Sequence, residues 1–113
     1  MRGQVVLDTI TQAVAAEAKN VLGDKLEKII LYGSYARGDF DGESDVDIMV
    51  LADVSAADAR LIDNRLIKLA NRLGLENDVA VSVLVKDCET FYRFIDTEPF
   101  YKNVAREGLP VNA

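Results

Sequence analysis

Asp45 and Asp47 stand one residue apart at the start of an apolar segment that runs on through Val50. Side chains alternate between the two faces of a β-strand, so both carboxylates are expected on one face, with Val46 and Ile48 on the other. Two neighbouring carboxylates repel each other, and the apolar residues offer no compensating charge. Because Mg²⁺ binds carboxylate oxygens together with substrate phosphates, the pair predicts a magnesium site.

A glycine–serine pair, Gly33-Ser34, ends the preceding apolar run, which extends from Ile29 to Tyr32. The run predicts a buried strand, and Gly33 permits a tight turn that brings the backbone close to a ligand. Ser34 is expected to cap a short helix whose N-terminal N–H groups can hold phosphate. Gly-Ser turns and Asp-x-Asp pairs are each common by themselves. Their combination, a strand, Gly-Ser, ten residues, Asp-x-Asp and a second strand, predicts one site that holds phosphate and metal.

The two motifs together resemble those of a known family. GSYARG at positions 33–38, followed by SDVD at positions 44–47, resembles the signature of the minimal nucleotidyltransferases, members of the polymerase-β-like superfamily. The segment PFYKNVAREG at positions 99–108 resembles the tail of short members that act as antitoxins beside HEPN-domain RNase toxins. The resemblance implies a single nucleotidyltransferase domain over residues 1–113. It also implies transfer of AMP from ATP to a tyrosine hydroxyl of the toxin.

The resemblance also implies roles for single residues. Gly33 and Ser34 are expected to hold the β- and γ-phosphates of ATP. Arg37 is expected to add a positive charge near the triphosphate, although it is equally able to pair with Asp39 or Asp41. The predicted nucleotide site therefore combines a backbone turn with one nearby cation.

A third carboxylate is expected from a neighbouring strand of the family fold, and Asp78 is the candidate. Asp45, Asp47 and Asp78 would then hold two Mg²⁺ ions roughly 3.5–4 Å apart, and Asp78 would help to deprotonate the acceptor. Along a predicted strand from Asn77 to Val85, Ser82 shares a face with Asp78 and is the nearby candidate without a carboxylate. The alternative is that Asp78 only begins a strand after a turn. Nucleotide binding would then survive while catalysis becomes doubtful.

Composition limits the classes of function. The 113 residues carry a net charge of −6, with no basic cluster to neutralise phosphates, so no nucleic-acid partner is expected. No apolar run approaches the ~20 residues of a membrane span, no signal-peptide core follows Met1, and the single cysteine suits a reducing compartment. These features predict a cytoplasmic protein without a membrane partner. Because histidine is absent, catalysis is left to carboxylates and hard metal ions.

The rest of the sequence predicts the elements that position these residues. Helices are predicted over Gln4–Leu22, from the cap Ser55 to Leu73 with Gly74 as its end, over Thr90–Ile95, and from Pro99 through Glu107 with Gly108 as its end. The second of these is expected to bury an apolar face of Leu61, Ile62, Leu66, Leu69, Ala70 and Leu73. The order strand, strand, helix, strand predicts an α/β (α+β) fold, a small mixed sheet packed with helices.

Three functions fit these features. The leading hypothesis is Mg²⁺-dependent transfer of AMP from ATP, or of another nucleotide, to a partner protein. The second is a non-catalytic antitoxin that neutralises its partner by binding, which the acidic charge and the aromatic residues after position 90 favour. The third keeps the chemistry with a small-molecule acceptor such as an aminoglycoside, although relatives of that kind carry an extra domain. A domain this small leaves a nucleotide open to solvent, so a homodimer or a hetero-oligomer is expected to cover it.

Overall fold

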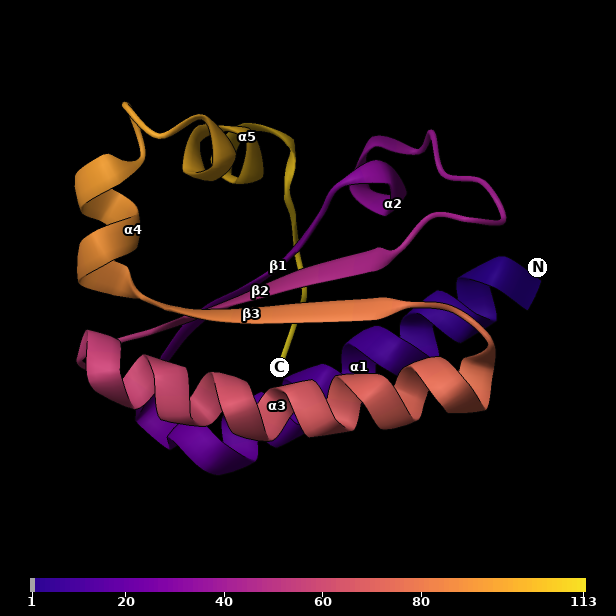
Figure 1. The fold of residues 1–113 in the computed structure, drawn as a ribbon, viewed down its shortest axis with the longest axis horizontal. Coiled ribbons are helices and arrows are strands. Elements are labelled where there is room, and N and C mark those ends of the chain that lie inside the picture. Colours follow the sequence, from indigo (N-terminus) through magenta and orange to yellow (C-terminus); the bar gives the residue numbers. More distant parts are fainter. Residues whose placement is uncertain (1) are drawn as a thin grey trace.

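The protein is built on a mixed four-stranded sheet in the order β3-β2-β1-β4 (Figure 1). The structure, a computed structural model, describes residues 2–113. Its strands are β1 (Leu26–Tyr32), β2 (Val46–Ala52), β3 (Val81–Asp87) and β4 (Leu109–Pro110). β1 is antiparallel to both β2 and β4, whereas β2 and β3 are parallel. The predicted mixed sheet packed with helices is therefore confirmed.

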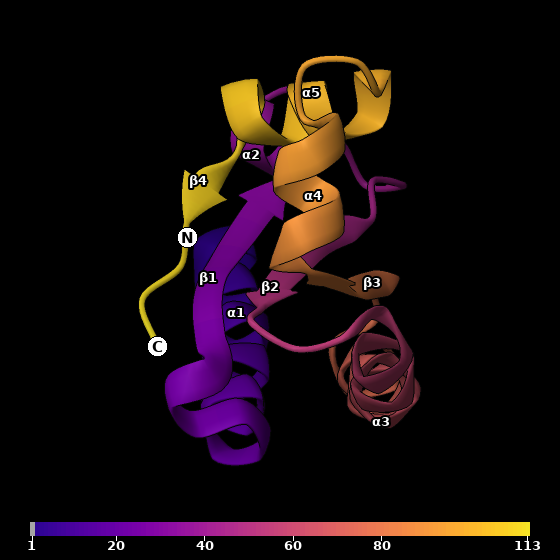
Figure 2. The same cartoon turned by 90° about the vertical axis from the view of Figure 1, so that its left-hand side faces the viewer.

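Helices cover both faces of this sheet. They are α1 (Arg2–Leu22), α2 (Ser34–Arg37), α3 (Ala56–Asn77), α4 (Cys88–Phe94) and α5 (Pro99–Glu107), with the short 3-10 turn η1 (Gly23–Lys25) between α1 and β1. α1 and α3 lie on one face, and α4 and α5 lie on the other (Figures 1 and 2). α2 is the single turn of helix that follows the end of β1. Within residues 2–113, no helix is long and apolar enough to cross a membrane.

β2 is buried on both of its faces, which explains its continuous apolar sequence. Ile48 and Val50 belong to the core beneath α1 and α3. Met49 and Leu51 belong to a second core that includes Phe91 of α4. The alternation of side chains along β2 therefore divides the interior into two cores, one on each side of the sheet.

The C-terminal end of α3 differs from the prediction. The helix continues past Gly74 to Asn77 and ends at Asp78, which has a left-handed conformation with φ of 54°. The N–H groups of Asp78 and Val79 both donate to the Gly74 carbonyl, the latter at 3.1 Å. A Cβ at Gly74 would lie 2.7 Å from the Val79 carbonyl oxygen, so this glycine permits a close approach rather than ending the helix. The predicted strand start at Asn77 is therefore wrong.

Other helix predictions hold with small changes. Ser55 caps α3 as expected, since its hydroxyl accepts a hydrogen bond from the Asp58 N–H at 3.1 Å. Leu61, which was predicted to be buried, is 67% exposed. α4 begins at Cys88, before the predicted start, because the Asp87 side chain caps it by accepting a hydrogen bond from the Thr90 N–H at 2.9 Å.

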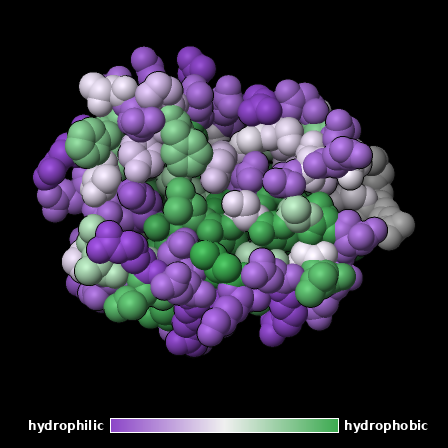
Figure 3. Space-filling view, viewed as in Figure 1, coloured by the Kyte–Doolittle hydropathy of each residue, from purple (hydrophilic) through white to green (hydrophobic). Residues whose placement is uncertain are grey.

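β3 forms an outer edge of the sheet, on the side seen in Figure 1. Figure 3 shows hydrophobic groups in a band across the middle of this side, between hydrophilic regions above and below. The Val85 N–H on β3 donates to Oδ1 of Asp63 on α3 at 2.8 Å. A side chain of the covering helix thus satisfies part of the strand edge.

Candidate active site

Asp47 lies in the middle of a row of three side chains that crosses the sheet. It pairs with Tyr32 on antiparallel β1 and with Ser82 on parallel β3. Residues that pair directly across strands share a face of the sheet. Because Asp47 alternates with Ile48, the row lies on the face covered by α4 and α5. The sequence pattern predicted only that Asp47 and Ile48 lie on opposite faces.

Asp45 precedes β2 by one residue and is close enough to Asp47 to affect its ionisation. Burial raises the pKa of the Asp47 carboxyl above its ordinary value, the negative charge of Asp45 raises it further, and Arg37 opposes both. The expected repulsion between the two carboxylates is therefore present. Hard oxygen donors of this kind suit Mg²⁺, so the pair fits a cation of that type.

Gly33 brings the Gly-Ser turn directly against Asp47. Its backbone has φ of 76° and ψ of −155°, a combination that is essentially restricted to glycine. A Cβ built at this position would overlap Oδ2 of Asp47. The two motifs, separated by ten residues in the sequence, therefore lie in contact in the fold.

Ser34 does not cap the short helix, and that prediction is wrong by one residue. Gly33 is the cap position, and its carbonyl accepts hydrogen bonds from the N–H groups of Ala36 and Arg37, each at 3.1 Å. Ser34 is instead the first residue of α2, directly after the turn that contacts Asp47. It remains next to the candidate phosphate position.

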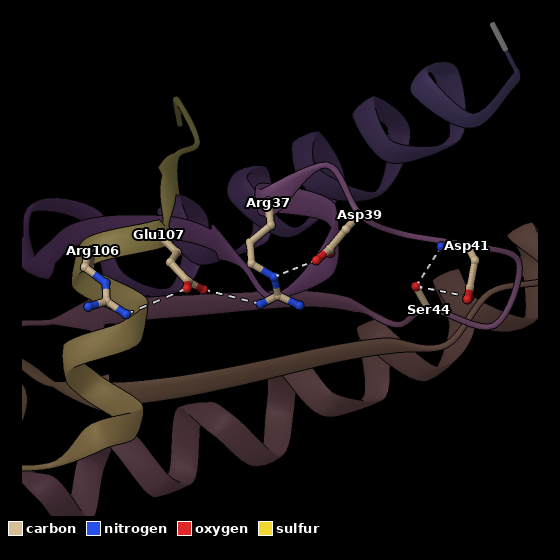
Figure 4. A network of polar contacts seen from close by, with 6 residues as sticks. All are labelled: Arg37, Asp39, Asp41, Ser44, Arg106 and Glu107. Carbon is tan, nitrogen blue, oxygen red and sulfur yellow. Dashed lines mark hydrogen bonds and ion pairs between the residues drawn. The ribbon is translucent and has the colours of Figure 1, made fainter.

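Arg37 links α2 to the distant helix α5. Its guanidinium donates to Asp39 at 3.1 Å and to Glu107 at 3.3 Å (Figure 4). The hydrogen bonds with Asp39 and then Glu107 raise the pKa of Arg37 above its ordinary value. Arg106 extends the network, with a nitrogen 4.0 Å from a Glu107 oxygen. Pairing with Asp39 was among the alternatives predicted from the sequence, whereas the contact with Glu107 was missed.

Asp41, the other predicted partner of Arg37, instead orders the loop before β2. Its carboxylate accepts hydrogen bonds from the Glu43 N–H at 2.9 Å and from the Ser44 hydroxyl at 3.3 Å. The same hydroxyl accepts from the Asp41 N–H at 2.9 Å (Figure 4). This compact turn leads directly into Asp45.

Asp78 does not form a metal-binding group with Asp45 and Asp47. It lies at the end of α3 rather than on β3, where it lines a surface cavity of about 630 Å³ together with Asp45. Among residues 2–113, no three acidic, histidine or cysteine side chains are grouped so that they could hold a metal ion. The predicted set of three carboxylates is therefore not assembled.

A small cavity next to the Gly-Ser turn adds residues that sequence reasoning missed. It has a volume of about 180 Å³ and is lined by Tyr32, Gly33, Arg37, Phe100, Asn103, Val104 and Glu107. The Tyr32 and Phe100 rings meet edge to face, with centroids 5.6 Å apart. Burial, followed by the charge of Asp47, raises the pKa of Tyr32 to about 12. Tyr32 lies beside Asp47 through the register between β1 and β2, and no local sequence pattern indicates that register or the contribution of α5.

The mixed sheet carries the glycine–serine turn directly against Asp47, the arrangement expected of a nucleotidyltransferase domain. Residues 15–111 match the nucleotidyltransferase domain family, and the chain belongs to that family.

Two curated relatives come from Methanocaldococcus jannaschii. "Putative protein adenylyltransferase MJ0141" is 39% identical over 80 residues, which are 71% of this chain and 79% of the relative. "Putative protein adenylyltransferase MJ0604" is 38% identical over 84 residues, which are 74% of this chain and 76% of the relative. Both matches exceed two thirds of each protein and support the family assignment.

Solved structures support the fold. One, described as a toxin–antitoxin with AMP-PNP, has a TM-score of 0.54 at 21% identity, and the match covers 89% of this chain and 72% of that one. A mutant of the toxin–antitoxin MntA-HpeT has a TM-score of 0.52 at 21% identity, covering 87% of this chain and 69% of that one. At these identities, the similarity establishes the shared architecture.

Proposed function

We propose that this protein is a Mg²⁺-dependent nucleotidyltransferase that transfers AMP from ATP to a hydroxyl group of a partner protein. The observation that carries the proposal is the contact between the Gly33 turn and the Asp47 carboxylate. This contact brings a backbone suited to phosphate within reach of a carboxylate suited to a cation. The family assignment and the names of the two curated relatives support the same reaction.

Each residue of the site has a separate role in positioning ATP. Gly33 and Ser34 bind the β- and γ-phosphates through the turn, and Arg37 adds a positive charge beside them. Asp45 and Asp47 bind Mg²⁺, which supplies charge neutralisation at the reacting phosphate. The acceptor oxygen bonds to the α-phosphorus, the bond to pyrophosphate breaks, and the hydroxyl proton leaves to solvent. Positioning and electrostatics dominate reactions of this kind, which suits a site without histidine.

The proposed acceptor is a tyrosine of a HEPN-type RNase toxin, so the protein acts as a cytoplasmic antitoxin. The tail at positions 99–108 supports this partner, and the solved structures with the same fold are toxin–antitoxin complexes by description. Residues 1–113 form one nucleotidyltransferase domain in this proposal. A hetero-oligomer with the toxin, or a homodimer, covers the bound nucleotide.

A non-catalytic antitoxin is the second candidate. Asp78 lies outside the carboxylate pair, and Tyr92, Phe94 and Phe100 are each about two fifths exposed, at 44%, 43% and 39%, on the helices that flank the site. Exposed aromatic side chains are suited to anchoring a protein interface. Under this candidate, toxin RNase activity falls when the two proteins are mixed without nucleotide. Full toxin activity in that mixture excludes it.

The proposed reaction is tested by incubating the protein with ATP, Mg²⁺ and the toxin partner, and measuring intact masses. The expected result is one or more added AMP groups on the toxin and none with the Asp47→Asn variant. Asp58→Asn, a matched change in the first turn of α3, is expected to retain full transfer. Equal AMP incorporation by wild type and Asp47→Asn would overturn the proposal.

A further inference from the structure

We propose that this chain holds a single divalent cation, on Asp45 and Asp47, because Ser82 occupies the position from which a carboxylate would hold a second one. This inference rests on the proposed nucleotidyl transfer and specifies its metal requirement. It replaces the two-ion site expected from the sequence with a one-ion site.

The strand register identifies the position that matters. Ser82 pairs directly with Asp47 across the parallel β2–β3 ladder, and neighbouring strands lie about 4.8 Å apart. Position 82 is therefore the place on β3 directly beside Asp47. Ser82 is exposed and lies on the Asp47 face of the sheet, opposite the buried side chains of Val83 and Val85.

No other residue on this side of β3 replaces the missing carboxylate. Leu84 and Lys86 follow Ser82 on the same face by alternation. Asp87, the only acid in β3, has the opposite parity and is 4% exposed. Its carboxylate is already used to cap α4 through the Thr90 N–H.

The acidic residues around the site have other roles. Asp39 and Glu107 both pair with Arg37. Asp41 orders its own loop, whereas Asp78, in the turn after α3, shares a cavity with Asp45 but not with Asp47. Among residues 2–113, no suitable group of three metal ligands is present. Asp45 and Asp47 are therefore the only pair proposed to hold the cation.

The chemistry of Mg²⁺ agrees with a one-ion site. Mg²⁺ is commonly bound by one or two carboxylates, substrate phosphates and water, which Asp45 and Asp47 satisfy when ATP is present. Two-ion sites hold their ions about 3.5–4 Å apart, so they need a further ligand beside the first pair. An aspartate at position 82 would extend toward Asp47 and supply that ligand.

The test counts Mn²⁺ bound in the presence of AMP-PNP, a non-hydrolysable ATP analogue, by equilibrium dialysis. Wild type is expected to bind one Mn²⁺ per bound nucleotide, and Ser82→Asp is expected to bind two. Ser82→Glu provides a second carboxylate variant with a longer reach. Asn64→Asp adds the same charge at an exposed position of α3, on the opposite face of the sheet, and is expected to retain one ion.

The outcomes separate this inference from the proposed function. Two ions per nucleotide in wild type, or one ion in both Ser82→Asp and Ser82→Glu, would overturn the inference and leave the transferase intact. Equal Mn²⁺ binding by wild type and Asp47→Asn would overturn the carboxylate site itself and, with it, both proposals. Circular dichroism confirms that each variant is folded before its ions are counted.

Discussion

Ionised Asp47 destabilises the folded, ligand-free protein because its charge is partly buried beside another carboxylate. Burial and the neighbouring Asp45 both raise its pKa, which means that the folded state disfavours the ionised form. A carboxylate that opposes folding and suits a cation is typical of a functional site. The protein thus retains a destabilising group at the position where the proposed reaction needs it.

Asp47→Asn is therefore expected to raise the free energy of unfolding of the ligand-free protein at pH 7. The raised pKa makes ionised Asp47 destabilising above its folded pKa, and this penalty fades as pH falls below the ordinary value of 3.8. The amide has no charge to desolvate, so the increase in the free energy of unfolding should be clear at pH 7 and absent near pH 3. Denaturant titration at the two pH values measures it. A variant that is less stable than wild type at pH 7 would contradict the prediction.

Gly33→Ala is expected to lower stability by about 1–3 kcal/mol and to abolish nucleotide transfer. The new Cβ would force a strained backbone conformation and overlap the Asp47 carboxylate. Gly42→Ala is the control in the nearby loop, since a Cβ there meets nothing within 4 Å. Thermal unfolding and AMP transfer are measured on both variants. A Gly33→Ala protein with wild-type transfer would show that the close contact is dispensable.

Tyr32 gives the folded protein a pH dependence at the alkaline end. Because its pKa is raised from 10.0 to about 12, the neutral phenol stabilises the fold below pH 10. That contribution is lost as pH rises from about 10 through 12. One tyrosine is expected to titrate late in the absorbance at 295 nm, and Tyr32→Phe should remove that late step. A wild-type titration without a step near pH 12 would contradict the assignment.

At the scale of secondary structure, α4 and α5 attach to the sheet through one compact core. Phe91 is 2% exposed and packs in this core with Met49, Leu51 and Val104. The core therefore fixes where α5 lies, and with it the Arg37–Glu107 contact beside the Gly-Ser turn.

Phe91→Ala is expected to cost about 3–5 kcal/mol, because it removes a buried ring and leaves a cavity under both helices. Phe94→Ala, on the same helix, changes a side chain that is 43% exposed and is expected to stay within about 0.5 kcal/mol of wild type. Urea unfolding of the two variants gives the comparison. Similar losses of stability in both variants would show that buried Phe91 and exposed Phe94 contribute equally to the stability of the fold.

Sequence patterns predicted those elements whose signals are local. Strand alternation placed Asp47 on the correct face, and Pro99 with Gly108 bounded α5 correctly. The end of α3 was mispredicted because Gly74 has two possible uses, ending a helix or permitting close contact, and only the returning chain at Val79 selects the second. Local composition contains no information about that contact.

At the scale of the whole molecule, the site depends on contacts between distant segments. Arg37 and Glu107 are separated by 70 residues, and no periodicity connects them. β4 is two residues long, too short to give a strand pattern, yet it pairs with β1. The position of Ser82 beside Asp47 likewise follows only from the register between β2 and β3. The joining of the Gly-Ser turn with Asp47 could be read from the sequence, but the positions of Tyr32, Ser82 and Glu107 around them required the fold.

The most direct test of the account is the fate of each phosphate of ATP. The protein is incubated with Mg²⁺ and its toxin partner, once with ATP labelled at the α-phosphate and once with ATP labelled at the γ-phosphate. The account predicts that α-label becomes bound to the partner and γ-label is released as pyrophosphate, with both products absent for Asp47→Asn. Transfer of the γ-label to the partner, or no transfer of either label by the folded wild-type protein, would contradict it.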